Sequence, residues 1–326
     1  MRSTRRSGSD PRRPRLAAPR RALPIALPLV GLLLALGSCS KTPPAVAFDG
    51  KAAMTWAEKQ VAFGPRVPGT AAHDSCFAFL LETLRGTTPD VEADTFSYTV
   101  PELKKTVRLM NVRARFRPES KQRVLLAAHW DTRPWADRDP DPARRGQPIL
   151  GANDGASGVA VLLEVARMLK ARGPALGVDI ALFDGEDLGT ETNPSGYFRG
   201  SIRYVAEHAA EPPPLFVILV DMVGRRGANF YWEGLSEDKA SNIVSLVWDR
   251  ARSLGIRRFL PGVKATVYDD HVAFLNAGIP AIDVIDFAFP EWHTHKDDLS
   301  ILSPEPLEDV GRVLVSLVMD TDYVSN

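Results

Sequence analysis

Short, almost uninterrupted apolar runs alternate with helical patterns from residue 123 onward. The four runs cover residues 124–128, 178–183, 215–220 and 279–285. A strand that is apolar on both faces is buried on both, which is typical of parallel sheets covered by helices. Before these runs, residues 91–100 and 106–116 alternate in polarity and predict an antiparallel pair at a sheet edge. We therefore predict an α/β fold with a mostly parallel sheet.

Helical patterns supply the layers that cover such a sheet. We predict helices over residues 49–61, 71–84, 238–254 and 304–318, and one from residue 155 onward. In the last of these, Val159, Leu162 and Leu169 fall on one face, as expected of a helix that packs on a sheet.

The first 38 residues have the pattern of an export signal. Eight arginines and one acid, Asp10, precede an apolar stretch, Leu23–Leu36. At about 14 residues this stretch is too short to span a bilayer comfortably. It ends in Leu36-Gly37-Ser38-Cys39, which resembles the bacterial lipobox. The alternative is an ordinary cleavage site with a chance cysteine.

We predict a lipoprotein signal peptide over residues 1–38, lipidation of Cys39, a tether over residues 39–48 and a single catalytic domain over residues 49–326. The expected product is an exported bacterial lipoprotein that faces the periplasm or the cell exterior. It would touch the membrane through its lipid anchor only.

The charge balance changes once the leader is removed. The chain holds 40 basic and 40 acidic residues, but eight of the bases and one of the acids lie in residues 1–38, so the rest carries a net charge of −7. A mildly acidic domain without a basic stripe argues against nucleic-acid binding. With Cys39 lipidated, only Cys76 remains, so a hydrophobic core and no internal disulfide must hold the fold. We favour a monomer.

Acidic residues and histidines follow the buried runs. They are His129 with Asp131, Asp154, the pair Glu186-Asp187, Asp221 and His293. Ligands of open parallel sheets bind at the carboxyl ends of the strands, so we expect these side chains to converge. Carboxylates and imidazoles in this mixture are typical of a hydrolytic zinc site.

Several of these residues have a second, purely structural interpretation. Asp131 lies two residues after His129 in an extended chain, so it can orient that histidine, although such a pair alone is a weak signal. Asp154 either caps the following helix or binds a metal, and the small residues around it favour metal binding. Glu186-Asp187 is either a solvated loop or a ligand beside a general base. For Asp270, capping of a short helix is as good an interpretation as a functional role.

Taken in order, these motifs resemble those of the M28 zinc aminopeptidase family, and within it most closely those of the glutaminyl-peptide cyclotransferases. They are H-x-D at 129–131, G-A-N-D-G-A-S-G at 151–158, D-G-E-D at 184–187, D-M-V-G at 221–224, D-D-H at 269–271 and W-H-T at 292–294. The resemblance covers roughly residues 57–317. It implies a three-layer α/β/α sandwich with a mixed, mostly parallel central sheet.

The resemblance implies two alternative ligand sets. In the two-metal aminopeptidases, a residue matching Asp154 bridges the ions, His129 and Asp221 complete one site, and Asp187 and His293 complete the other. In the cyclases one zinc ion is held by Asp154, Asp187 and His293. The implied cofactor is therefore Zn²⁺, one ion or two. In the cyclases, the catalytic acids would be Glu186, Asp221 and Asp269.

Residues beside the metal separate the two enzymes. Trp292 and Asp269 resemble cyclase residues, and Val267 and Phe289 match further positions of the glutamine pocket. Three departures from the animal cyclases argue against this assignment. Asp187 replaces a glutamate, Thr192 stands near the place of a second pocket tryptophan, and residues 132–150 form a longer insert that is expected at the rim.

We therefore expect a cyclotransferase that converts the N-terminal glutamine of a peptide or protein to pyroglutamate and releases ammonia. The alternative is a two-zinc aminopeptidase that releases N-terminal residues. A third interpretation, from another class, is a non-catalytic ectodomain that binds peptides, but no ligand position is missing from the sequence.

Overall fold

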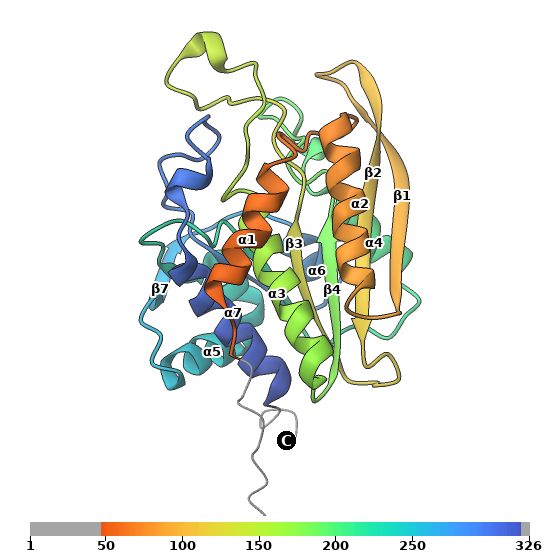
Figure 1. The fold of residues 1–326 in the computed structure, drawn as a ribbon, viewed down its shortest axis with the longest axis vertical. Coiled ribbons are helices and arrows are strands. Elements are labelled where there is room, and N and C mark those ends of the chain that lie inside the picture. Colours follow the sequence, from red (N-terminus) through yellow and green to blue (C-terminus); the bar gives the residue numbers. More distant parts are fainter. Residues whose placement is uncertain (1–46, 321–326) are drawn as a thin grey trace, which may run out of the picture. The chain divides into compact units, whose positions relative to one another are not determined.

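A computed structural model describes residues 47–320 (Figure 1). Six strands form its central sheet, in the order β1-β2-β4-β3-β5-β8. The strands are β1 (Val91–Val100), β2 (Lys105–Phe116), β3 (Arg123–His129), β4 (Gly177–Phe183), β5 (Val217–Asp221) and β8 (Ala281–Ile285). β4, β3, β5 and β8 run parallel, whereas β1 pairs with β2, and β2 with β4, in antiparallel register. The prediction of a mixed, mostly parallel sheet is confirmed.

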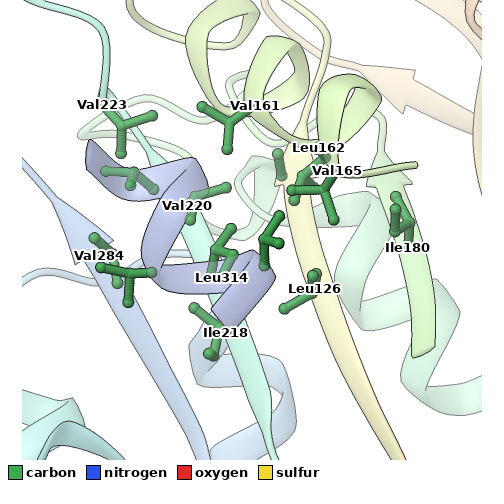
Figure 2. Packing of buried hydrophobic residues seen from close by; sticks show 14 of the residues in the cluster. Leu126, Val161, Leu162, Val165, Ile180, Ile218, Val220, Val223, Val284 and Leu314 are labelled. Atoms are coloured by element: carbon green, nitrogen blue, oxygen red, sulfur yellow. The ribbon is translucent and has the colours of Figure 1, made fainter. Parts of the chain in front are cut away.

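Successive side chains of each strand point to opposite faces of the sheet, so the core has two layers. In β3, Leu126 belongs to the large apolar cluster on one face, whereas Leu125 belongs to the smaller cluster on the other. The helices of the large cluster are α2 (Ala71–Arg85), α3 (Ala156–Arg172), α5 (Gly234–Ser253) and α7 (Pro304–Met319). Figure 2 shows Leu126 and Ile218 of the sheet beside Leu314 of α7 and Val165 of α3. Because both of their faces are buried, the four parallel strands β4, β3, β5 and β8 are mostly apolar.

The opposite face is covered by α4 (Arg199–Glu207) and α6 (His271–Asn276). Tyr204 and Phe274 of these helices pack against Phe183 of β4. Helix α1 (Gly50–Val61) lies outside α3 and α7, and its N-cap Asp49 accepts the N–H groups of Lys51 and Ala52. The three-layer α/β/α sandwich is therefore confirmed.

Helix α4 and two strands escaped the sequence prediction. A parallel pair, β6 (Phe230–Glu233) and β7 (Phe259–Ala265), forms a second, small sheet. β6 has four residues, and β7 contains Pro261 and Gly262, so neither has a strong strand pattern. Helix α5 also begins four residues before the predicted Asp238, because the Glu233 carboxylate accepts the N–H groups of Leu235 and Ser236.

A buried arginine joins the loops at the carboxyl edge of the sheet. The Arg66 side chain is fully buried and donates hydrogen bonds to the backbone oxygens of Trp130, Leu150 and Gly151. These loops follow β3 and precede α3, so Arg66 holds together the segments that carry His129 and Asp154.

The predicted signal peptide, Cys39 and most of the predicted tether lie outside the described residues. Within residues 47–320, no helix combines the length and the apolar character needed to cross a membrane.

Candidate metal centre and pocket

Two groups of ligand-type side chains lie at the carboxyl edge of the sheet and share Asp154. The His129 group consists of His129, Asp154 and Asp221, and the His293 group consists of Asp154, Asp187 and His293. All five residues are buried. Each group places one imidazole and two carboxylates within reach of a single ion, a donor set that zinc accepts. The structure thus brings together the residues that the sequence placed at a metal.

The His129 group is closed by direct contacts between its own side chains. His129 Nε2 lies 3.1 Å from Asp221 Oδ1 and 3.1 Å from Asp154 Oδ1. Burial alone would lower the pKa of His129, but Asp131, Asp154 and Asp221 hold that pKa well above its ordinary value. His129 therefore interacts directly with both carboxylates of its group.

The His293 group is more widely spaced. His293 Nε2 lies 3.7 Å from Asp154 Oδ2 and 3.6 Å from Asp187 Oδ1, both beyond hydrogen-bond distance. Asp187 Oδ2 is buried and has no hydrogen-bond partner, which is costly unless a further group binds there. Two ligands of a tetrahedral zinc ion lie roughly 3.4 Å apart. The spacing and the orphaned oxygen therefore fit zinc.

Glu186 faces the same space. Its Oε2 lies 4.0 Å from His129 Nδ1. Burial raises the pKa of Glu186 well above its ordinary value, and the charges of Asp187 and Asp269 raise it further, whereas His129 opposes the shift. A carboxyl group whose pKa lies closer to neutrality exchanges protons readily, as general acid–base catalysis requires.

Asp131 holds the loop that carries Glu186 and Asp187. Its carboxylate oxygens accept the backbone N–H of Glu186 at 3.1 Å and that of Asp187 at 3.3 Å. The distance from Asp131 Oδ1 to His129 Nδ1 is 3.6 Å, too long for a hydrogen bond. The orientation of His129 by Asp131 thus stays a prediction, and the structure adds a contact to the loop that the sequence did not indicate.

Asp154 does not cap α3, so the capping interpretation is wrong. The N-cap residue is Gly155, and no side chain caps the helix. The backbone N–H groups of Asn153 and Asp154 instead donate to Asp297 at 2.7 and 3.1 Å. Gly155 has a φ of +97°, and a Cβ there would lie 2.6 Å from the backbone oxygen of Asp131. This glycine therefore lets the loop pack against the end of β3, whereas the sequence suggested close approach to a bound group.

A cavity of about 450 Å³ opens over these residues. Its polar lining consists of Asp154, Glu186, Asp187, Asp221, Asp269, Thr266 and His293. Its apolar and aromatic lining consists of Pro194, Tyr197, Phe198, Met222, Val267, Tyr268, Ile285, Phe287 and Trp292. Trp292 and Val267 thus lie where the resemblance placed them. Phe289 is not among the lining residues, because it is buried behind them in one apolar cluster with Met222 and Val267.

Sequence reasoning missed one wall of this cavity. Thr192 is exposed, whereas Tyr197 and Phe198, a few residues later, line the cavity. Phe198 has a φ of +59°, an uncommon conformation for an aromatic residue. Such conformations concentrate at functional sites. The adjacent aromatic pair was the available signal in the sequence.

Buried acids continue behind the cavity. Burial, followed by the charges of Asp221 and Asp270, raises the pKa of Asp269 well above its ordinary value. Asp270 stands at the N-cap position of α6 but makes no capping hydrogen bond, and its Oδ1 accepts the Ser201 hydroxyl at 2.5 Å instead. Its pKa is raised to about 7, mainly by burial. The charge of Asp269 also raises the pKa of Glu186, so these acids are linked pairwise behind the cavity.

Comparisons with known proteins give the family context. Residues 111–318 match the model of Peptidase family M28. The glutaminyl-peptide cyclotransferase of Drosophila melanogaster is 24% identical over 277 residues, which cover 77% of this chain and 75% of that protein.

Solved structures are more similar. The glutaminyl cyclase of Bacteroides thetaiotaomicron has a TM-score of 0.81 and 35% identity, covering 84% of this chain and 98% of its own. A leucine aminopeptidase precursor from the same bacterium has a TM-score of 0.82 and 36% identity, covering 85% of this chain and 98% of its own. Because the two named activities differ, the choice between them depends on the site residues.

Proposed function

We propose that this chain, which belongs to peptidase family M28, is a zinc-dependent glutaminyl-peptide cyclotransferase. Its substrate would be the N-terminal glutamine of a peptide or protein, and its products a pyroglutamyl peptide and ammonia. Relatives that carry the name of this activity support the proposal.

The observation that carries the proposal is the difference between the two ligand groups. In the His129 group the imidazole already contacts both carboxylates at 3.1 Å, whereas the His293 group is more widely spaced and keeps an orphaned oxygen. This arrangement favours one ion on Asp154, Asp187 and His293. A single ion is what the resemblance to the cyclases implies, whereas the aminopeptidases of the family use two.

Zinc bound to these three ligands would polarise the γ-carbonyl of the substrate glutamine. The α-amine nitrogen then attacks the γ-carbonyl carbon, a ring C–N bond forms, and the side-chain amide C–N bond breaks. Glu186 accepts the proton that the amine loses and returns it to the departing nitrogen, which leaves as ammonia. Its raised pKa suits both transfers.

The remaining lining residues orient the substrate and limit water. The reaction uses the substrate's own amine as nucleophile, so a water molecule at the same carbon would only hydrolyse the amide. Trp292, Val267 and Phe198 line the cavity with apolar surface and reduce the space for water. Burial and the neighbouring charges of Asp187 and Asp269 keep the pKa of Glu186 high, and Asp221 in turn raises the pKa of Asp269.

The second candidate function is a two-zinc aminopeptidase, favoured by the similarity to the leucine aminopeptidase precursor. It requires a second ion on the His129 group, which has the residue types for one. The ion would have to replace the existing contacts of His129 with Asp154 and Asp221. A non-catalytic peptide-binding role is disfavoured, because all ligand positions are present and buried and Glu186 lines the cavity beside them.

One experiment tests these candidates against each other. The purified protein is incubated separately with a peptide that begins with glutamine and with an aminoacyl-nitroanilide, and its zinc content is measured on the same sample. We expect ammonia and pyroglutamate from the first substrate and one zinc ion per chain. Nitroaniline release without ammonia would overturn the cyclase in favour of the aminopeptidase, and neither product would support a binding protein.

We further propose that the chain is exported as a lipoprotein anchored through Cys39. The support is the arginine-rich leader, the short apolar stretch and the Leu36-Gly37-Ser38-Cys39 sequence. Expression in a bacterial host with radiolabelled palmitate tests it. We expect label in the wild-type chain and none in Cys39→Ser. Label in both chains would show that Cys39 is not the lipidated residue and would overturn this proposal.

A further inference from the structure

Residues 132–150 contact the ligands of the proposed zinc site from behind. Arg133 has a side chain that is only 1% exposed, and its Nη1 donates to Asp187 Oδ1 at 2.6 Å. The same nitrogen lies 3.3 Å from the backbone oxygen of Asp187 and 3.2 Å from that of Gly189. Arg133 therefore restrains both the carboxylate of Asp187 and the loop on which it stands, and leaves Asp187 Oδ2 free.

Asp137 links Arg133 to the second ligand, His293. Arg133 holds Asp137 through two hydrogen bonds, from Nε at 2.8 Å and from Nη2 at 3.0 Å. Asp137 Oδ1 in turn lies 3.2 Å from His293 Nδ1. The pair is close but is not aligned as a hydrogen bond, and the negative charge of Asp137 favours the tautomer in which Nδ1 carries the proton and Nε2 faces the metal. Burial would raise the pKa of Asp137, but its contacts with His293 and Arg133 outweigh this and lower it.

The sheet itself does not bring these two ligands together. Asp187 follows β4 and His293 follows β8, and two other strands, β3 and β5, separate β4 from β8. The chain of contacts Asp187–Arg133–Asp137–His293 spans that separation.

Neighbouring residues of the same segment hold the loop that carries His293. The Arg138 backbone N–H donates to the His293 backbone oxygen at 3.2 Å, and its guanidinium lies 4.3 Å from the centre of the Trp292 ring. Asp139 Oδ2 lies 2.7 Å from His295 Nδ1. Arg133, Asp137, Arg138 and Asp139 are not among the residues that line the cavity. The segment therefore supports the site and does not form the rim that the sequence suggested.

We propose that Arg133 and Asp137 are positioning residues that set the affinity of the His293 group for zinc. They couple Asp187 to His293 and hold the two side chains beside each other, with Asp187 Oδ2 free to bind the ion. The shorter ligand Asp187, in place of a glutamate, is held in place by Arg133. The inference rests on the proposed zinc site, but it holds whether the enzyme is a cyclase or an aminopeptidase.

The test measures the zinc affinity of purified full-length variants by competition with a chromogenic chelator. We expect Arg133→Met and Asp137→Ala to weaken zinc binding by about 10–100-fold, as is typical when a residue behind a ligand is removed. Arg133→Lys, which keeps the charge and loses the two-point contact, should lose less than Arg133→Met. Arg144→Met, an exposed arginine of the same segment, is the matched control and should leave the affinity unchanged.

Two measurements separate positioning from general damage. The Asp137 side chain is 45% exposed, so we expect Asp137→Ala to leave the melting temperature of the zinc-free protein within about 2 °C of wild type. Because both residues act through one chain of contacts, the double variant should lose little more zinc affinity than the worse single variant. If wild type binds zinc and the variants bind it with an affinity within about twofold of the wild-type value, this inference is overturned while the proposed zinc site stands. Wild type that binds no zinc would overturn the proposed zinc site as well.

Discussion

The His129 group and the His293 group contain the same residue types and share Asp154, yet they differ in how they are completed. His129 and Asp221 end β3 and β5, which are neighbours in the sheet, so their side chains meet directly at 3.1 Å. Asp187 and His293 stand on loops after strands that are not neighbours. Their spacing of 3.6 Å is kept by Arg133 and Asp137. Adjacency in the sheet thus brings the His129 group into direct contact, whereas separation leaves the His293 group more open, as the proposed single-ion site requires.

The largest expected contrast is between the two histidines. His293→Ala should lose zinc and, with it, at least about a thousandfold in turnover, because a metal that polarises a carbonyl supplies several kcal/mol in the transition state. His129→Ala should keep one zinc ion per chain. Zinc content by atomic absorption and pyroglutamate formation by mass spectrometry provide the readouts. Equal loss of zinc in both variants would remove the distinction between the groups.

Glu186 lies beside both groups and should separate catalysis from metal binding. Glu186→Gln removes the proton acceptor with little change in volume, so we expect a loss of about 10²–10⁴-fold in kcat. Zinc content should stay at the wild-type level. The control is Glu58→Gln, on the exposed side of α1. Normal turnover in Glu186→Gln would exclude Glu186 from the proton transfers.

Stability should also distinguish the groups when zinc is removed. His129→Ala leaves Asp154 and Asp221 buried without their partner, so we expect a cost of about 3 kcal/mol in the free energy of unfolding. This cost should persist in a chelator. His293→Ala should be less stable than wild type only when zinc is present, because wild type then loses its bound ion on unfolding. Urea unfolding with and without the chelator measures both; a chelator-independent cost in His293→Ala would contradict the expectation.

The smallest effect concerns Glu233, which caps α5 and accepts the backbone N–H of Val267, a residue that lines the cavity. Burial would raise the pKa of Glu233, but its contact with His271 and the amides of Leu235, Val267 and Ser236 lower that pKa to about 2. A depressed pKa stabilises the fold above the ordinary value near 4.5 and loses that contribution as the pH falls towards 2. At pH 7, Glu233→Gln should therefore cost about 1–2 kcal/mol. The difference from wild type should shrink between pH 4.5 and 2, and a constant difference would exclude the charge as its cause.

His129, Asp187, Asp221 and His293 were accessible from the sequence because they end or follow buried strands, whereas Asp154 was marked by the small residues before α3. β3, β4, β5 and β8 were recognised from their apolar runs, and parallel strands present their carboxyl ends at one edge. The role of Asp297 was not accessible, because it binds the backbone of Asn153 and Asp154 from a loop more than a hundred residues away. Its type and local pattern are those of an ordinary loop acid.

The alternation of apolar strands with helices determined the layers, and the order of acids and histidines determined the chemistry, since both are local properties of the chain. Only the tertiary structure decided which ligand group is closed and which fits an ion, because this depends on which strands are neighbours. It also assigned Arg133 and Asp137 to the back of the zinc site, where a charged, proline-rich segment had suggested a rim. A charged residue in a loop has no distinguishing pattern until the fold gives it a partner.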